Sequence, residues 1–262
     1  MEPETNQQLE MFSREWYNEY FRRAVSSPTH SRFCEKVYGI DLCQHGLMDS
    51  DELDFLSSQI HAGQHVLEIG CSNGFVTEEI HHRTGCSVHG IDFSDTAIEQ
   101  ARERTHHNNG LSFECLDLTK DPLPAGPFDV ILSIDSLYFL GEYTDTIRKM
   151  LPSLTSEGSL ILSVFQFKRE EDPEEILLPD KSWLAQALDE VGLSYSWFDF
   201  TENVQRHGIL NHAVAEQLKE DFYREGNGFL YEARAAENRY FKQAAEEQSI
   251  VRYMYKTSTK AN

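Results

Sequence analysis

An apolar stretch that runs directly into a glycine-containing turn constrains the fold of this chain more than any other feature. Residues 65–75 are His-Val-Leu-Glu-Ile-Gly-Cys-Ser-Asn-Gly-Phe. The first five have the pattern of a short buried strand, and Gly70 and Gly74 permit backbone angles and a close ligand approach that a side chain would block. The helix expected after Gly74 directs its free N–H groups and the positive end of its dipole at the turn. The stretch therefore predicts a site for a nucleotide-like ligand at the carboxyl end of a parallel strand.

The turn has two other possible interpretations. The dinucleotide fingerprint Gly-x-Gly-x-x-Gly would require small residues at positions 72 and 75, and Phe75 does not satisfy it. An ordinary strand-to-helix turn of another α/β protein remains possible when the turn is considered alone, because glycine-rich motifs are weak evidence in isolation.

Three further expected strands each end near an acidic residue. The segment Cys86–Asp92 ends in an aspartate about 20 residues beyond the glycine turn, where a carboxylate accepts hydrogen bonds from ribose hydroxyls. Ser94 is expected to cap the helix that follows. Strands are also expected at Leu111–Cys115, shortly before Asp117, and at Phe128–Ile134. The order of these strands predicts an α/β protein with a parallel sheet.

The motif Glu68-x-Gly70-x-Ser72-x-Gly74 resembles the first motif of class I S-adenosylmethionine (SAM)-dependent methyltransferases, acidic-x-Gly-x-Gly-x-Gly, with serine at the middle glycine. The run Asp135–Phe139 resembles the fourth motif of small-molecule members of that family, and no subfamily is identified. The resemblance implies a doubly wound α/β fold with a seven-stranded, mostly parallel sheet. Its strand order would be 3-2-1-4-5-7-6, with the last strand antiparallel, helices on both faces and helical lid additions. It also implies SAM as cofactor and S-adenosylhomocysteine as product.

The resemblance assigns cofactor-binding roles by position. The residues of the glycine turn shape the site, and residues at the end of the second strand contact the ribose and adenine of SAM. Residues from the N-terminal segment close over the methionine part of SAM. The predicted cofactor-binding residues are Glu68, Gly70, Cys71, Ser72, Gly74, Asp92, Phe93, Asp117, Leu118, Ile134, Tyr17, Tyr38 and Gln44. Two alternatives stay open: Glu68 as a carboxylate that braces the loop, and Asp92 as a helix cap.

Methyl transfer is an in-line displacement for which the cofactor supplies the leaving group, so catalysis depends mainly on positioning and electrostatics. The predicted catalytic residues are Asp135, Tyr138 and His45. Asp135 would orient an amine or act as a base, Tyr138 would line the methyl pocket, and His45 would act as a base. The alternatives are a loop-capping carboxylate, a packing tyrosine and a core histidine.

The rest of the chain completes the expected sheet and adds two segments. We expect a helix at Thr144–Leu151, a turn at Ser156–Gly158, a helix from Ser182 to Gly192, and strands at Ser159–Phe167, Leu193–Phe200 and Ile250–Lys256. The predicted division is an N-terminal helical cap or lid at 1–60 and a SAM-binding core at 61–262, with a helical insertion at about 202–248. In the resembled family such additions form a substrate chamber; the alternative is that they only pack on the core.

Composition disfavours several classes of partner, although Arg22, Arg23 and Arg32 could form a local basic patch. The formal net charge of −21 disfavours nucleic acid and anionic membranes as partners. The chain has no apolar run long enough to span a bilayer, and its first residues lack the features of a signal peptide. Five scattered cysteines favour a reduced, cytoplasmic protein. The sequence leaves open whether the protein is a monomer or a homodimer.

No metal site is expected. Adjacent histidines, as in His81–His82 and His106–His107, point to different sides of a helix and are poorly placed to share a metal ion. The chain also lacks the Asp…Asp-Asn set that resembles magnesium-dependent methyltransferases of the catechol type.

The function predicted from the sequence is SAM-dependent methyl transfer to a nitrogen or oxygen of a small molecule in a lidded pocket, an activity of class EC 2.1.1. A protein side-chain methyltransferase and a non-catalytic SAM-binding protein remain as alternatives. An NAD-dependent dehydrogenase is disfavoured by Phe75.

Overall fold

A single seven-stranded sheet organises the molecule, for which a computed structural model describes residues 9–258. The ends of the two predicted units, residues 1–8 and 259–262, lie outside the described residues. In chain order the strands are β1 (His65–Ile69), β2 (Ser87–Asp92), β3 (Leu111–Cys115), β4 (Phe128–Ile134), β5 (Leu154–Phe167), β6 (Ser194–Asp199) and β7 (Ile250–Ser258).

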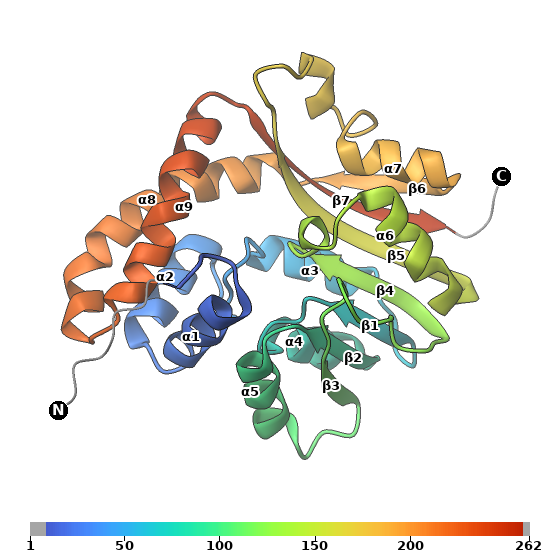
Figure 1. Ribbon diagram of the computed structural model, residues 1–262, viewed down its shortest axis with the longest axis horizontal. Coiled ribbons are helices and arrows are strands. Elements are labelled where there is room, and N and C mark those ends of the chain that lie inside the picture. Colours follow the sequence, from blue (N-terminus) through green and yellow to red (C-terminus); the bar gives the residue numbers. More distant parts are fainter. Residues whose placement is uncertain (1–8, 259–262) are drawn as a thin grey trace.

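The strand order across the sheet is β3-β2-β1-β4-β5-β7-β6, as predicted (Figure 1). Strands β1 to β5 pair in parallel wherever they are neighbours. Strand β7 lies between β5 and β6 and is antiparallel to both. The crossover from β3 to β4 passes over β2 and β1, so the strand order reverses between β1 and β4, where α/β sheets bind ligands.

Helices cover the sheet and extend beyond one end of it. They are α1 (Arg14–Ala24), α2 (Pro28–Tyr38), α3 (Ser50–Ser58), α4 (Phe75–Thr84), α5 (Asp95–Thr105), α6 (Tyr143–Met150), α7 (Trp183–Val191), α8 (Thr201–Arg224) and α9 (Gly228–Glu246). Short 3-10 turns lie at η1 (Leu137–Phe139), η2 (Leu151–Ser153) and η3 (Glu174–Leu177).

The two faces of the sheet have separate hydrophobic cores. Leu67 and Ile131 belong to the core that contains α6 and α7, whereas Val66 and Val130 belong to the core that contains α3 and α4. Successive residues of one strand point to opposite faces, so central strands buried on both sides need nearly continuous apolar residues. The sequence Phe-Asp-Val-Ile-Leu-Ser-Ile of β4 meets that requirement.

The segments before β1 and between β6 and β7 form a common helical layer, which we call the lid. Figure 1 shows α1 and α2, in blue, beside α8 and α9, in orange and red, at one end of the sheet. The four helices share one hydrophobic core. Trp16, Phe33 and Phe222 are among its buried aromatic members, and amphipathic helical spacing brings them to one side of each helix. The lid is thus assembled from two segments far apart in the sequence.

Several local expectations are confirmed. Strands β3 and β4 have the predicted bounds, and Ser94 and Ser182 accept the capping hydrogen bonds of α5 and α7. Gly192 ends α7 with a φ of 79°, in the left-handed region that glycine adopts easily.

The predicted turn at Ser156–Gly158 is wrong. Strand β5 begins at Leu154, which pairs with Phe128, and the next pair along the ladder is Ser159 with Val130. The extra residues form an irregularity inside the strand. A bulge of this kind keeps the chain extended while it shifts register, so the glycine there marks a bulge rather than a chain reversal.

Within residues 9–258, no helix combines the length and apolar character needed to cross a bilayer. All five cysteines are free, and four of them are buried.

Candidate functional site

The turn after β1 is held in one conformation by contacts from β2 and β4. The carbonyl of Ile91 accepts hydrogen bonds from the N–H groups of Gly70 and Cys71 at 2.8 and 3.0 Å. Gly70 has a φ of 77°, and a Cβ there would lie 2.3 Å from Cβ of Ser136. Ser136 also donates a hydrogen bond to the carbonyl of Ile69 at 2.7 Å. Glycine is therefore required at position 70 both by the backbone angle and by the neighbouring loop.

Serine at the middle glycine position of the motif adopts the glycine-like conformation. Ser72 has a φ of 53°, and Gly74 has a φ of 81° where it begins α4. The turn thus takes up positive φ angles at three alternate residues, despite the one non-glycine residue. The free N–H groups of the first turn of α4 follow directly, which suits a ligand with partial negative charge.

Glu68 lies beneath the turn and is buried. Its Oε2 accepts a hydrogen bond from the hydroxyl of Thr77, in the first turn of α4, at 2.5 Å. Burial raises the pKa of Glu68 to about 7 because the charged form loses its hydration, with a partial offset from the Thr77 hydrogen bond. The contact with Thr77 matches the bracing alternative; a direct contact with the cofactor stays a prediction.

Asp92 joins the turn to the helix that follows β2. Its Oδ2 accepts a hydrogen bond from the N–H of Ser72 and its Oδ1 from the N–H of Ser94, both at 2.9 Å. Burial raises the pKa of Asp92, and these backbone hydrogen bonds oppose the rise. A carboxylate has about four acceptor positions, so Asp92 retains acceptor capacity for ribose hydroxyls.

Helix α1 covers the ends of β2 and β3. The ring of Tyr17 lies 5.5 Å from that of Phe93, and the hydroxyl of Ser94 donates a hydrogen bond to Oδ1 of Asn18 at 2.6 Å. Arg14 lies 3.8 Å from a carboxylate oxygen of Asp117. The structure thus brings Tyr17, Phe93 and Asp117 to one edge, with Arg14 and Asn18 beside them. The resemblance assigns Tyr17 to the methionine end of the cofactor instead.

Asp117 is fixed by its own loop. It accepts hydrogen bonds from Lys120 at 2.6 Å and from the hydroxyl of Thr119 at 2.5 Å, and these lower its pKa to about 2. The neighbouring Leu118 lines a cavity of about 540 Å³ between this loop and α6. Leu118 therefore borders a space just after β3, while Asp117 bonds within its loop and does not line that cavity. Contacts of both residues with adenine stay a prediction.

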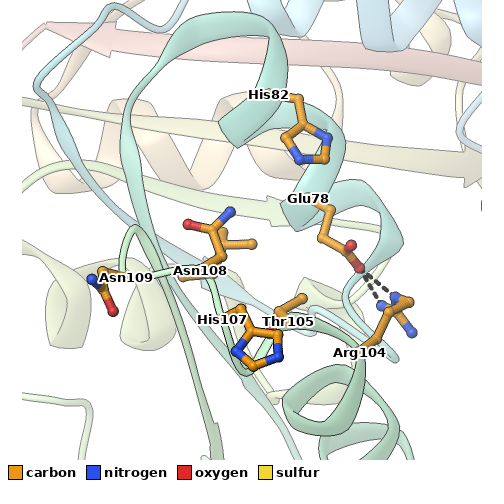
Figure 2. A pocket seen from close by; sticks show the side chains of 8 residues that line it. Glu78, His82, Arg104, Thr105, His107, Asn108 and Asn109 are labelled. Atoms are coloured by element: carbon orange, nitrogen blue, oxygen red, sulfur yellow. Dashed lines mark hydrogen bonds and ion pairs between the residues drawn. The ribbon is translucent and has the colours of Figure 1, made fainter.

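A second cavity, of about 340 Å³, lies apart from the predicted site. Figure 2 shows it between α4, with Glu78 and His82, and the connection from α5 to β3, with His107 and Asn108. No residue predicted to bind the cofactor lines it. Glu78 points toward Arg104, with which it forms an ion pair (Figure 2). Among the described side chains, which are those of residues 9–236 and 239–258, no group of three His, Cys, Asp or Glu is placed to hold a metal ion.

The substrate side begins where β4 ends, after Ile134. Asp135 has a φ of 51°, and both of its carboxylate oxygens accept hydrogen bonds from Arg252 of β7, at 2.5 and 3.1 Å. Its Oδ2 also accepts a hydrogen bond from the N–H of Leu47 at 2.8 Å. Asp135 is therefore part of an ion-paired group and is bonded to the loop before α3.

Aromatic side chains complete this side of the site. Tyr138 in η1 has its ring 5.3 Å from that of Phe165 near the end of β5. Phe165 and Phe167 both lie 5.0 Å from Phe241 of α9. The predicted neighbourhood of Tyr138 is thus aromatic and bounded by the lid.

His45 lies inside the lid core. Its ring is 4.8 Å from that of Tyr20, 5.3 Å from that of Trp16 and 5.5 Å from that of Tyr17. Burial, and then the positive charge of Arg234, keep the pKa of His45 well below its usual value. The imidazole is therefore neutral at physiological pH, and its role as a base stays a prediction.

The polar ends of two further predicted residues, Tyr38 and Gln44, have hydrogen-bond partners within the protein. Tyr38 lies between α2 and α8, where its hydroxyl donates a hydrogen bond to Asn211 at 3.2 Å. The amide of Gln44 braces its own loop, accepting from the N–H of Leu42 at 2.9 Å and donating to the carbonyl of Met48 at 3.1 Å. Tyr38 thus bonds within the lid and Gln44 within its own loop, and a direct contact of either residue with the cofactor stays a prediction.

Arg252 and Glu52, which are fully buried and ion-paired with each other, were not predicted from the sequence. One signal was available: Arg252 interrupts the apolar and aromatic first part of β7, residues 250–255, and a charge buried at such a position requires a partner. The identity of the partner was not predictable, since Glu52 lies 200 residues away in the sequence.

Comparison with known proteins agrees with this geometry. Residues 66–158 match the methyltransferase domain family. The malonyl-[acyl-carrier protein] O-methyltransferase of Bacillus cytotoxicus is 32% identical over 101 residues, which are 38% of this chain and 35% of that protein. The phosphoethanolamine N-methyltransferase of Plasmodium falciparum is 24% identical over 140 residues, 53% of each chain. The chain therefore matches about a third to a half of the length of these relatives.

The fold is similar to that of phosphoethanolamine N-methyltransferase 2 of Haemonchus contortus, solved in complex with SAM. The TM-score is 0.70 at 14% sequence identity, over 92% of this chain and 59% of that one. The segment that matches the methyltransferase domain family, residues 66–158, contains the glycine turn, Asp92 and the end of β4. These parts of the site lie near the boundary between β1 and β4, where the strand order reverses. On this evidence, residues 66–158 form a methyltransferase domain, and the chain resembles the class I SAM-dependent methyltransferases in its motifs and fold.

Proposed function

We propose that this protein transfers the methyl group of SAM to a nitrogen or oxygen of a small molecule, in a pocket closed by the lid. One observation carries the small-molecule part of the proposal. The aromatic rings at the ends of β4 and β5 meet α9 of the lid, with Phe165 5.3 Å from Tyr138 and 5.0 Å from Phe241. A substrate side walled by aromatic side chains from both sheet and lid suits an acceptor enclosed on several sides.

The residues of the turn fit the cofactor. The positive φ angles of Gly70, Ser72 and Gly74 leave the backbone open to close approach, and Asp92 has acceptor positions for ribose hydroxyls beyond its two backbone hydrogen bonds. When bound, SAM supplies an activated methyl group and its own leaving group.

The chain's own residues position the reactants. The turn and Asp92 fix the cofactor end, while Tyr138, Phe165 and Phe241 shape the acceptor side and exclude water from it. An acceptor held in line is sufficient for the reaction, so a strong base is required only where the acceptor carries a proton that must leave. The oxygens of Asp135 are occupied by Arg252 and Leu47, which favours an orienting role for this residue over proton abstraction.

The identity of the acceptor is open between nitrogen and oxygen. The names of the two relatives describe O-methylation of one compound and N-methylation of another. A protein side-chain methyltransferase and a non-catalytic SAM-binding protein are the alternatives that an experiment must separate. We also propose a cytoplasmic location and no nucleic-acid or membrane partner, supported by the five free cysteines and the net charge of −21.

The test uses SAM with an isotopically labelled methyl group. Purified protein is incubated with a metabolite extract and, separately, with a protein fraction, and the label is followed by mass spectrometry. A labelled low-mass product that depends on the enzyme supports the proposal and identifies the acceptor. Label only in protein favours side-chain methylation, and tight SAM binding without any label in either fraction favours the non-catalytic alternative. Asp92→Asn serves as the inactive control, and Asp95→Asn, on the exposed start of α5, as the matched active control.

A further inference from the structure

We propose that Arg252 is a positioning residue for methyl transfer, which fixes the loop of residues 43–49 at the active-site end of the sheet by holding Asp135 and Glu52 together. This inference rests on the proposed function, because it assigns Arg252 a part in placing the acceptor. Residues 43–49, which we call the lid loop, lead from Cys43 to Asp49, the N-cap of α3.

The first step of the argument is the ion-paired group itself. The side chains of Arg252 and Glu52 are fully buried, and that of Asp135 is 6% exposed. Arg252 directs Nε and Nη2 at Glu52, with an Nη2–Oε2 distance of 3.1 Å. Its Nη1 and Nη2 contact the two oxygens of Asp135 at 2.5 and 3.1 Å. The planar guanidinium thus makes two forked contacts at once, which the single ammonium of a lysine cannot reproduce.

The second step connects this group to the lid loop. Oδ2 of Asp135 accepts a hydrogen bond from the N–H of Leu47 at 2.8 Å. The preceding Gly46 packs so closely that a Cβ there would lie 3.0 Å from the same oxygen. The N–H of Asp135 is bonded in turn to the carbonyl of Ser163 in β5 at 3.0 Å. The carboxylate is therefore held between sheet and loop, and its direction determines where the loop lies.

The third step is a separate anchor on the other side of the loop. Arg234, buried in α9, donates hydrogen bonds to the carbonyls of Gln44 at 2.5 Å and His45 at 2.9 Å. It also donates to the hydroxyl of Tyr20 at 2.8 Å. The lid loop is thus fixed from the lid by Arg234 and from the sheet by Arg252. Loss of Arg252 should release the loop near Leu47 while the Gln44 end stays attached.

The functional consequence follows from the position of Asp135. It comes directly after β4, on the same side of the site as Tyr138 and Phe165. If the lid loop moved by about an ångström, the acceptor held between the loop and η1 would be misplaced. A misalignment of this size lowers the rate of an in-line displacement strongly. The cofactor contacts of Asp92 and the turn are on β1 and β2 and do not involve Arg252. We therefore expect acceptor use to suffer more than cofactor binding.

The experiment compares Arg252→Lys and Arg252→Met with wild type. Lys256→Met is the matched control, since Lys256 lies on the same strand, is only partly buried and contacts Gln59 rather than the lid loop. Hydrogen exchange of the peptide covering residues 43–49 measures the loop, calorimetry with S-adenosylhomocysteine measures the cofactor site, and steady-state kinetics with the identified acceptor measures KM and kcat.

For Arg252→Lys we expect at least about tenfold faster exchange at Leu47, a Kd for S-adenosylhomocysteine within about threefold of wild type, and at least about a tenfold rise in acceptor KM. Arg252→Met should show the same pattern more strongly. Arg252→Lys retains the positive charge between the carboxylates, so it remains informative even where Arg252→Met fails to fold.

Wild-type exchange at Leu47 together with wild-type acceptor KM in Arg252→Lys would overturn the proposal. An equal loss of cofactor and acceptor binding would also overturn it, because it would indicate a general structural role. The exchange and calorimetry arms need no acceptor. Failure to find any methylated product would therefore count against the proposed function, while the Leu47 result would still decide whether Arg252 holds the loop.

Discussion

Oδ2 of Asp92 accepts a hydrogen bond from the backbone N–H of Ser72 at 2.9 Å, which joins the acidic end of β2 to the middle of the glycine turn. The same carboxylate receives the N–H of Ser94 on its other oxygen. The residue expected to bind ribose therefore also sets the shape of the turn. Asp92 was considered either as a ribose-binding residue or as a cap of the following helix. The observed geometry allows both roles at once.

Asp92→Asn should weaken binding of S-adenosylhomocysteine by at least about tenfold, equivalent to about 1.4 kcal/mol. The amide keeps one acceptor oxygen but puts an NH₂ group where the second carboxylate oxygen meets a backbone N–H. Isothermal titration calorimetry measures the change, with Asp95→Asn expected to bind as wild type does. Unchanged affinity in Asp92→Asn would remove Asp92 from the cofactor site.

Ser72→Gly should stabilise the protein by about 0.5–1 kcal/mol, because Ser72 has a φ of 53° and glycine occupies that region without a Cβ penalty. Ser58→Gly is the matched control. Ser58 lies in the last turn of α3 with an exposed side chain, where glycine lowers helix stability by about 0.5–1 kcal/mol. Urea unfolding of both variants should therefore give changes of opposite sign, and a loss of stability in Ser72→Gly would contradict the argument.

Gly70→Ala should destabilise the protein by about 2–4 kcal/mol, since the new Cβ combines a positive φ with overlap against Ser136. Adding Ser136→Gly removes the side-chain atom that would lie 2.3 Å from the new Cβ. The double variant should recover about 1 kcal/mol relative to the sum of the single variants. A double-mutant cycle by urea unfolding checks the coupling; strict additivity would show that the overlap is relieved in another way.

The stability of the protein should fall as the pH rises from about 4.5 to about 7 through the titration of Glu68. Burial raises its pKa to about 7 in the folded state from an ordinary value of 4.5, so the folded state binds more protons than the unfolded state in this window. The contribution is fully present below about pH 4.5, is lost as the pH rises through about 7, and is on the order of 3 kcal/mol.

Glu68→Gln keeps the hydrogen-bonding shape and removes this titration. Urea unfolding at pH 5 and pH 8 should show a larger drop in the free energy of unfolding for wild type than for Glu68→Gln. Glu99→Gln, at an exposed position of α5, should retain the wild-type drop. Equal pH dependence in wild type and Glu68→Gln would mean that Glu68 is ionised in the folded protein.

The sheet was predictable because its strands carry their own signals. The apolar run of β4 and the glycines after β1 specify local structure that does not depend on distant partners. The start of β5 was not predictable in the same way. Gly158 has the composition of a turn, and only pairing with β4 keeps the chain extended there.

The proximity of Glu68, Ser72 and Asp92 was predictable for a similar reason, since they lie at or just after the ends of adjacent parallel strands. The lid was different. Tyr38 ends α2 and His45 lies in the loop before α3. The sequence does not say whether either side chain faces the strand ends or the lid core. Their partners, Asn211 and Arg234, come from α8 and α9. Contacts over such separations depend on tertiary packing, which local periodicity does not encode.

The long-range pair of Glu52 and Arg252 also sets an order of events during synthesis. A ribosome releases the lid loop and α3 about 200 residues before it releases Arg252. Until β7 has inserted between β5 and β6, two carboxylates destined for burial have no counter-charge, and burying them is strongly unfavourable. A nascent chain therefore keeps this end of the molecule open, and the active-site end closes only after the sheet is complete.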